Sequence, residues 1–375
     1  MTKHLTAGQE LEITSSTAKF FNRSGYHLLA PHNHRIKASC NYTKGSNDGE
    51  FLHVQTDYTH NDDGGQSIFV SSNFTKTSLF NHLIIVMRNT TSSISDDDAA
   101  SGRFECRLQV EKRERCDCGW GRPVDRRIVN GSETERNEFP SVVAMIHVPS
   151  NYTFCGGTII HPRYILSAAH CFVSHTYRNR YEVKILLGAH NYHDKSTSSY
   201  HTAYQFEKII THPNYETTEQ DNDILLLKLT REIIFSRGVG PACLPWKFVN
   251  YNFYDDDVQM VGWGTTTWHG QLSQVPRKVT LKVMDTDICD KKIVWVNEKK
   301  LCTYAEQRDG CQSDSGGPVY YTSPADNRQY VVGIISFGIR CATKSPGVNT
   351  RVTNYLAWIA MTVEENERDA FCAIE

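Results

Sequence analysis

The sequence predicts an all-β protein with two domains, and chain length, strand spacing and cysteine distribution support this prediction. The 375 residues divide into about 2.5 domains at roughly 150 residues per domain. Short apolar runs of strand length, such as 83–87 and 224–227, recur between clusters of Gly, Asn and Pro. The 12 cysteines are scattered rather than arranged in the tight pairs of a zinc site, which favours disulfides and an oxidising compartment.

Three regions follow one another along the chain. Residues 1–110 are rich in Ser, Thr, Asn, His and Asp and predict a β-sandwich, with short strands at 35–39, 51–54, 67–70 and 82–86. Residues 111–127 (EKRERCDCGWGRPVDRR) are charged and aperiodic, so we expect an exposed linker. Residues 128–375 predict a larger all-β domain with one helix near its end, where Tyr355, Trp358, Ile359 and Thr362 have helical spacing.

Composition excludes several classes of function. A net charge of −2, from 40 Lys and Arg against 42 Asp and Glu, gives no general attraction for nucleic acid or anionic membranes. No apolar run approaches the 18 or so residues of a transmembrane helix, so we expect no membrane partner. The acidic runs at 96–98 and 255–257 are expected to be solvated loops, and we predict neither a metal site nor a cofactor.

The compartment is predicted to be extracellular. Besides the cysteines, Asn-X-Ser/Thr sequons indicate a secreted glycoprotein; they begin at Asn22, Asn41, Asn73, Asn89, Asn130 and Asn151. Residues 1–14 have no apolar core and no cleavage site, so no signal peptide is visible.

Three residues carry the pattern of nucleophilic catalysis. Ser315 lies in the Gly-rich turn CQSDSGGPV, which would expose its hydroxyl and aim backbone N–H groups at one point. A serine needs an adjacent base, which His170 in LSAAHC could provide. Asp223 in DNDILLLKL begins a strongly apolar strand, where a carboxylate is costly to bury unless it is paired with such a histidine.

These segments, together with IVNG, GWG and SFG, resemble the chymotrypsin/trypsin (S1) family of serine proteases over residues 128 to about 361. The resemblance implies two six-stranded β-barrels with the catalytic groups in the cleft between them. It also implies that His170 is the general base and then acid, that Asp223 orients it, and that Ser315 is the nucleophile. The implied oxyanion donors are the backbone N–H groups of Ser313 and Ser315.

The same resemblance implies disulfides and an activation step. The implied bonds of the second domain are Cys155–Cys171, Cys289–Cys302 and Cys311–Cys341, and Cys243 would pair with Cys118 or Cys116 of the linker. Val258 and Tyr321 stand where many relatives have one further bond. Cleavage of Arg127–Ile128 by an upstream protease would free the Ile128 amine, which would pair with Asp314 and order the specificity pocket.

Specificity for Arg or Lys at P1 is implied by Asp309 at the position of the pocket floor, because a buried cation needs a counter-charge. Gly338 and Gly347 align with the pocket walls. Ser336 aligns with a serine that hydrogen-bonds the aspartate and begins the strand on which substrate backbone pairs.

Four positions depart from the family pattern. Ser313 replaces a glycine that supplies an oxyanion N–H, a donor worth on the order of 10²–10³ in rate. Arg340 stands at the mouth of the pocket and could offset Asp309, repel a cationic substrate or point to solvent. Phe337 replaces the usual tryptophan and preserves an apolar platform. Ala189 replaces the glutamate of calcium-binding members, so no calcium site is expected there.

The N-terminal domain resembles a divergent CUB module of the kind joined to trypsin-like domains in insect haemolymph and venom proteases. The matching segments are HRIKASC, SIFVSSNFTKTSLFNHLIIVM and GRFECRLQV, followed by CDCGWGRP. Only Cys40 and Cys106 remain of the usual four cysteines, and the resemblance pairs them; Cys372 has no assigned partner. The implied role is binding of a protein or glycan, with a simple folding and solubility module as the alternative.

The leading hypothesis is therefore a secreted zymogen of a trypsin-like serine endopeptidase that acts on protein substrates. A second hypothesis is a protease homologue that binds partners without cleaving them, for which Ser313 is the only argument. A third is a protease with a different P1 preference, in which Arg340 neutralises Asp309.

Overall fold

The structure is a computed structural model, and it divides the chain into two compact units. One unit contains residues 1–115 and the other residues 116–359, with the C-terminal residues distributed between them. The described residues are 2–6, 8–14, 25–29, 34–43, 50–56, 66–70, 73–77, 82–89, 103–112, 118–121, 132–173, 179, 181–192, 202–265, 271–291, 293, 296–304, 314–338, 346–364 and 367.

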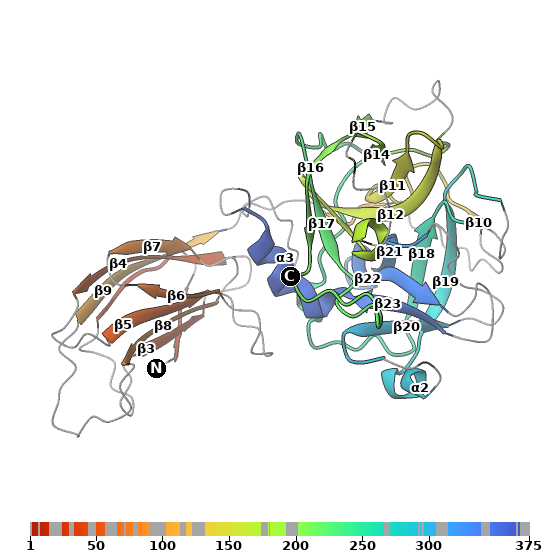
Figure 1. Cartoon of the computed structure of the whole chain (residues 1–375). Coiled ribbons are helices and arrows are strands. Elements are labelled where there is room, and N and C mark those ends of the chain that lie inside the picture. The colour runs from red at the N-terminus through yellow and green to blue at the C-terminus, as the bar shows by residue number, and fades with distance from the viewer. Residues whose placement is uncertain are drawn as a thin grey trace. The chain divides into compact units, whose positions relative to one another are not determined.

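The first unit is a sandwich of two β-sheets (Figure 1). The first sheet contains, in spatial order, β1 (Thr2–His4), β3 (Gly25–Leu29), β8 (His82–Asn89), β5 (Glu50–Thr56) and β6 (Gln66–Val70). The second contains β2 (Glu10–Thr14), β9 (Arg103–Lys112), β4 (His34–Thr43) and β7 (Phe74–Thr77). All the strand pairs in these sheets are antiparallel except β1 with β3.

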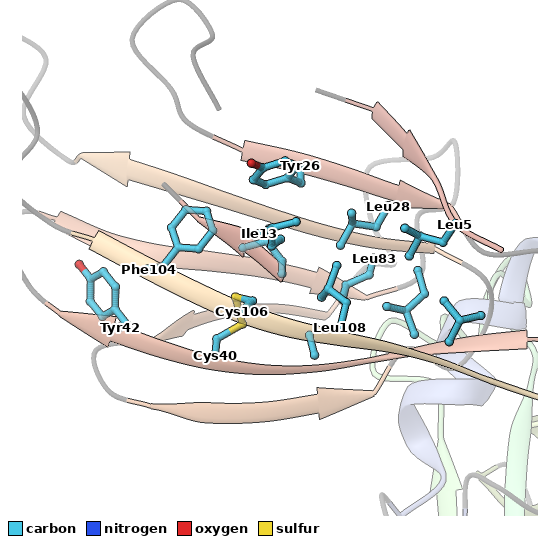
Figure 2. Close-up of a cluster of buried hydrophobic side chains, with 14 residues drawn as sticks. Leu5, Ile13, Tyr26, Leu28, Cys40, Tyr42, Leu83, Phe104, Cys106 and Leu108 are labelled. Carbon is cyan, nitrogen blue, oxygen red and sulfur yellow. A yellow bond between two sulfur atoms is a disulfide. The ribbon is translucent and has the colours of Figure 1, made fainter. Parts of the chain in front are cut away.

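The core of this unit lies between the two sheets. Figure 2 shows Leu28 and Leu83 of the first sheet facing Leu108 of the second. Cys40 and Cys106 are directly opposite partners on β4 and β9, and they form a disulfide that is buried in this core. Alternation along β4 and β9 places the intervening polar residues outside, as expected for sheets with one buried face.

The second unit contains two closed sheets. The strands of the first are, in spatial order, β15 (Thr202–Tyr204), β14 (Val183–Leu187), β11 (Val142–His147), β12 (Tyr152–His161), β13 (Tyr164–Ser167), β17 (Leu225–Leu229) and β16 (Phe206–Thr211). Only Gln205 separates β15 from β16, so one continuous segment pairs with both edges of the sheet. The sheet therefore closes on itself as a barrel of six strands.

A second sheet also closes on itself as a barrel. Its strands are β10 (Ser132–Glu133), β19 (Arg277–Val283), β18 (Asp257–Gly262), β21 (Pro318–Thr322), β22 (Gln329–Gly338), β23 (Gly347–Arg351) and β20 (Lys300–Tyr304). Because β19 also pairs with β20, six strands form the ring and the short β10 extends it. Among the described residues from 118 onward, the helices are α1 (His170–Val173), α2 (Thr286–Asp290) and α3 (Leu356–Thr362), the last preceded by the 3-10 turn η3 (Val352–Tyr355), with another 3-10 turn, η2, at Trp246–Phe248. No helix among the described residues is long and apolar enough to cross a membrane.

Apolar side chains occupy the two positions at which many members of the resembled family have a further disulfide. Val258 of β18 and Tyr321 of β21 are both buried in one cluster of the second barrel. The ring of Tyr321 packs edge-to-face on Phe248 and Phe253, with centroids 5.4 Å and 5.3 Å away. These aromatic contacts hold β21 against its neighbours without a covalent bond.

Residues 118–121 of the linker are built into the second unit. Cys118 is bonded to Cys243, and Gly119 donates a backbone hydrogen bond to Pro241 and accepts one from Gln329. The indole of Trp120 covers Gly240, where any side chain would overlap the ring. This part of the linker is therefore a packed strap rather than the exposed segment that composition predicts.

Candidate active site

Ser315 lies in a tight turn that both barrels hold in place. The turn precedes β21, and its Gly316 has φ +78°, a conformation that favours glycine. A Cβ at Gly316 would lie 2.7 Å from the carbonyl of Gly156 and would overlap Ser167, both in the first barrel. The carbonyl of Ser315 accepts a 2.8 Å hydrogen bond from Gly156 N–H, and Gly316 N–H donates to Ile335 of the second barrel.

His170 is brought next to this turn by the short helix α1. The buried sequence Ala168–Ala169 leads into α1, and Cys171 ties the helix to β12 through its disulfide with Cys155. Cys171 Sγ lies 4.0 Å from His170 Nε2 and 3.7 Å from the carbonyl oxygen of Ser315. Both are van der Waals contacts, because a disulfide sulfur has no proton to donate. The sulfur of Cys171 therefore contacts both the imidazole of His170 and the turn that holds Ser315.

Asp223 is fully buried at the entrance to β17. One carboxylate oxygen, Oδ2, accepts a 2.7 Å hydrogen bond from His170 Nδ1, and Oδ1 accepts a 2.9 Å bond from the His170 backbone N–H. With Nδ1 donating to the carboxylate, Nε2 of the neutral ring is the available proton acceptor. The hydrogen bonds from His170 thus offset the free-energy cost of burying this carboxylate.

A β-bulge supplies a third donor to the same carboxylate. The register between β22 and β23 shifts between Ile335 and Phe337, which leaves Ser336 as the extra residue. Its hydroxyl donates a 2.5 Å hydrogen bond to Oδ2 of Asp223. The structure thus brings His170, Asp223 and Ser336 into one hydrogen-bonded group.

The carboxyl of Asp223 keeps its negative charge despite its burial. Burial alone would raise its pKa, but the charge of His170 and the hydrogen bonds from His170 and Ser336 outweigh that effect and lower the pKa below its ordinary value. A charged Asp223 can stabilise an imidazolium on His170, as a general base requires when it takes a proton.

Asp314 points away from the serine turn and into the second barrel. Its Oδ1 accepts a 2.7 Å hydrogen bond from Gly264 N–H, and its carboxylate lies against Gly262, where any Cβ would overlap it. The GWG segment predicted as a family motif therefore forms a cradle for this carboxylate. Ile128, its implied partner, lies outside the described residues.

The two glycines predicted as pocket walls are directly opposite each other. Gly338 of β22 and Gly347 of β23 are register partners, so neither strand places a side chain at this pair. Other predicted residues lie outside the described part of the chain: Arg127, Ile128, Asp309, Cys311, Ser313, Arg340, Cys341, Cys116 and Cys372. Of the expected disulfides, the structure contains Cys40–Cys106, Cys118–Cys243, Cys155–Cys171 and Cys289–Cys302.

One cluster of metal-ligating residue types adjoins the site. Among the described residues, Cys155, His170 and Cys171 place one ligand atom each within 4.8 Å of one another. The two sulfurs are joined as a disulfide and cannot act as thiolates, so this cluster is not a metal centre.

Two contacts that help to position Asp223 and Ser336 were not predicted from the sequence. Thr350 of β23 donates from its hydroxyl to the backbone carbonyl of Asp223 over 2.8 Å, and Gln220 Oε1 lies 3.4 Å from Ser336 Oγ. Both residues are more than 100 positions from their partners. No local sequence pattern signals such pairs, because barrel closure alone brings them together.

Two closed β-barrels, with a histidine–aspartate pair beside a serine turn, define the class of the serine proteases. Residues 128–359 match the trypsin family, and the chain belongs to this family of serine endopeptidases. A venom serine protease of Polistes dominula is 39% identical over 66% of this chain and 88% of its own length. Venom serine protease 34 of Apis mellifera is 35% identical over 82% of this chain and 76% of its own length. The clotting factor G beta subunit of Tachypleus tridentatus is 31% identical over 64% and 81%.

Proposed function

We propose that the chain is the secreted zymogen of an endopeptidase that cuts proteins after Arg or Lys. The single observation that carries the catalytic part is the hydrogen bond between His170 Nδ1 and the buried, charged Asp223, next to the Ser315 turn. Two relatives named as venom proteases support secretion, as do the four described disulfides.

In this proposal Ser315 attacks the scissile carbonyl while His170 Nε2 takes its proton. The resulting imidazolium is stabilised by Asp223 and later donates that proton to the leaving amine, and water then hydrolyses the acyl-enzyme in the same manner. The backbone N–H groups of Ser313 and Ser315 stabilise the oxyanion. Ser336 and Thr350 keep Asp223 aligned through its side chain and its carbonyl, respectively.

The P1 preference rests on the pocket residues. Gly338 and Gly347 are partners on adjacent strands, which leaves the room that a long substrate side chain needs. Asp309 supplies the negative charge at the floor in this proposal. Arg340, in this proposal, does not neutralise Asp309.

Activation by an upstream protease is proposed at Arg127–Ile128. The freed Ile128 amine would join the Gly264 N–H as a second partner of Asp314, whose carboxylate lies in the GWG cradle. The strap at Cys118–Gly121, with its bond to Cys243, would retain the N-terminal unit after this cut. We further propose that the sandwich of residues 1–110 is CUB-like and binds a protein or glycan.

The test is amide hydrolysis after controlled cleavage at Arg127–Ile128, with Arg, Lys and Phe compared at P1 and Ser315→Ala as control. We expect turnover of the Arg and Lys substrates that disappears in the S315A variant. A preference for Phe would overturn the role of Asp309. Absence of turnover in a correctly cut and bridged chain would favour the non-cleaving homologue and point to Ser313.

A further inference from the structure

The turn that presents Asp223 is held in an unusual backbone conformation. Gln220 has φ +48° and Asn222 has φ +52°, so two non-glycine residues of this turn are left-handed. Non-glycine residues are strained in this conformation and persist in it only where their surroundings hold them. Asn222 is held by bonds from its Nδ2 to Asn214 and from Tyr355 to its Oδ1. Gln220, which is the less usual residue in this conformation, needs a separate explanation.

A buried lysine holds Gln220. Lys300 begins β20, its side chain is 1% exposed, and its Nζ donates a hydrogen bond to the backbone carbonyl of Gln220. The same Nζ lies 4.0 Å from Oδ1 of Asp221 and 5.6 Å from the ring centre of Phe337. A lysine is almost never fully buried without such partners, since its charge is costly to desolvate.

Lys299, which precedes Lys300 in the sequence, also donates hydrogen bonds to this turn. Its Nζ donates to Asp221 Oδ2 over 3.2 Å and to Asn222 Oδ1 over 3.3 Å, and Asn297 Nδ2 lies 3.3 Å from Asp221 Oδ1. Two consecutive lysines, the first residue of β20 and the residue before it, thus bind neighbouring residues of the turn. We call Lys299 and Lys300 the lysine clamp.

The charges that face Lys300 come from several elements. Asp221, Asp223 and Glu219 on the turn are negative, and Lys299 is positive. Arg351 of β23 donates its Nε–H to the backbone carbonyl of Lys300. Burial lowers the pKa of Lys300, and the charges of Asp221 and Asp223 oppose this change. The charge of the Lys300 ammonium therefore interacts with that of the Asp223 carboxylate, which is the hydrogen-bond partner of His170.

We propose that Lys300 is a positioning residue for Asp223: with Lys299 it holds the strained turn from which this carboxylate reaches His170. This inference rests on the proposed catalytic role of the His170–Asp223 pair. Each lysine donates a hydrogen bond to one of the two left-handed residues, Lys300 to Gln220 and Lys299 to Asn222. Removal of either lysine should therefore loosen the turn and the alignment of Asp223 with His170 Nδ1.

The test compares three variants of the cleaved chain: Lys300→Met, Lys299→Met and, as control, Lys282→Met. Methionine matches the length and apolar stem of lysine without its charge. Lys282 pairs with Asp257 at 3.1 Å on the exposed side of β19, so its removal leaves the site intact. Two quantities are measured for each variant: kcat and KM separately, and the NMR signal of the His170 Nδ1 proton, which reports its hydrogen bond to Asp223.

In K300M we expect kcat to fall about tenfold with KM little changed, because the misplaced group is Asp223 and not a substrate contact. The signal of the His170 Nδ1 proton should change in the same variant, because its hydrogen-bond acceptor is less constrained. K299M, which loses a more exposed side chain, should change both quantities in the same direction by less, and K282M should change neither. If K300M does not fold, K299M alone supplies the test.

A signal of the His170 Nδ1 proton that is unchanged in K300M and K299M would overturn the inference, even if both variants were less stable. This NMR measurement needs no turnover, so the inference is tested whether or not the chain hydrolyses peptides. An inactive parent chain in which K300M changes the His170 signal would contradict the proposed function and leave the lysine clamp standing.

Discussion

The hydroxyl of Ser336 lies 2.5 Å from Oδ2 of Asp223, the same oxygen that accepts the hydrogen bond from His170 Nδ1. Ser336 reaches this oxygen because a β-bulge adds one residue to β22 at that point. The strand predicted to bind substrate backbone therefore also helps to orient the residue that serves the base. The side chain of Ser336 thus links β22, the strand predicted to pair with substrate, to the His170–Asp223 pair.

Replacing Ser336 by alanine should lower kcat/KM about 10- to 100-fold, since a hydrogen bond to a charged group contributes about 1.5–3 kcal/mol. The reason is a less constrained Asp223, with two hydrogen bonds from His170 remaining. Steady-state kinetics on the cleaved chain measure this. Ser141→Ala is the matched control, because Ser141 Oγ is also buried but bonds Tyr320 OH at 2.6 Å. Equal losses of kcat/KM in S336A and S141A would contradict the prediction.

The stability of the second unit should fall in acid partly through Asp223. Its folded-state pKa is lowered, so its contribution is complete above its unfolded value of about 3.9 and is lost as the pH falls through the folded value. The free energy of unfolding, measured in denaturant from about pH 6 to about pH 3, should therefore decrease less steeply in Asp223→Asn than in the parent. The exposed Asp290, changed to Asn, is the control and should keep the parental slope. Parallel slopes for D223N and the parent would refute the assignment.

Gly316→Ala should disrupt the serine turn. The variant combines a left-handed residue at φ +78° with overlap between its Cβ and Ser167. Gly8→Ala separates these effects, because Gly8 has φ +71° and a Cβ there meets nothing within 4 Å. We expect about 1–2 kcal/mol of destabilisation for the first unit in G8A and several kcal/mol for the second in G316A. Hydrogen exchange in increasing denaturant measures each unit separately, and equal costs would contradict the clash.

Gly240→Ala should release the strap at Cys118–Gly121, because any Cβ at Gly240 overlaps the indole of Trp120. The Gly119 N–H that bonds Pro241 should then exchange with solvent faster, although the Cys118–Cys243 bond remains. Hydrogen exchange of the peptide containing Gly119 measures this. Gly333→Ala is the control, since its closest contacts are 3.0 Å or longer. Unchanged protection of Gly119 in G240A would show that the disulfide alone holds the strap.

Sequence patterns predicted the features that local chemistry determines. Apolar runs located the strands around Ile224–Leu227, and the spacing of Tyr355, Trp358 and Ile359 located η3 and α3. The family resemblance supplied the pairings of Cys155 with Cys171 and of Cys40 with Cys106, which the structure contains. These features depend on residues whose role can be read within a short window or from a motif.

Features created by barrel closure could not be predicted in this way. Lys300 lies in an ordinary segment, KKLCTY, in which two lysines suggest solvent exposure, yet its ammonium is buried against Gln220. The linker composition likewise suggests exposure, whereas Cys118 is fully buried. In both cases the partner lies 80 or more positions away, and only the folded chain shows that the charge or the backbone has a partner.

The most direct test of the catalytic proposal is covalent labelling of the cleaved chain by an organophosphonate, with the modified residue located by mass spectrometry. We predict one label per chain on Ser315, which His170→Ala and D223N slow strongly and which Ser141→Ala leaves unchanged. A label distributed over other serines, or no label on Ser315 in a correctly cleaved chain, would contradict the proposal that His170 and Asp223 activate this residue.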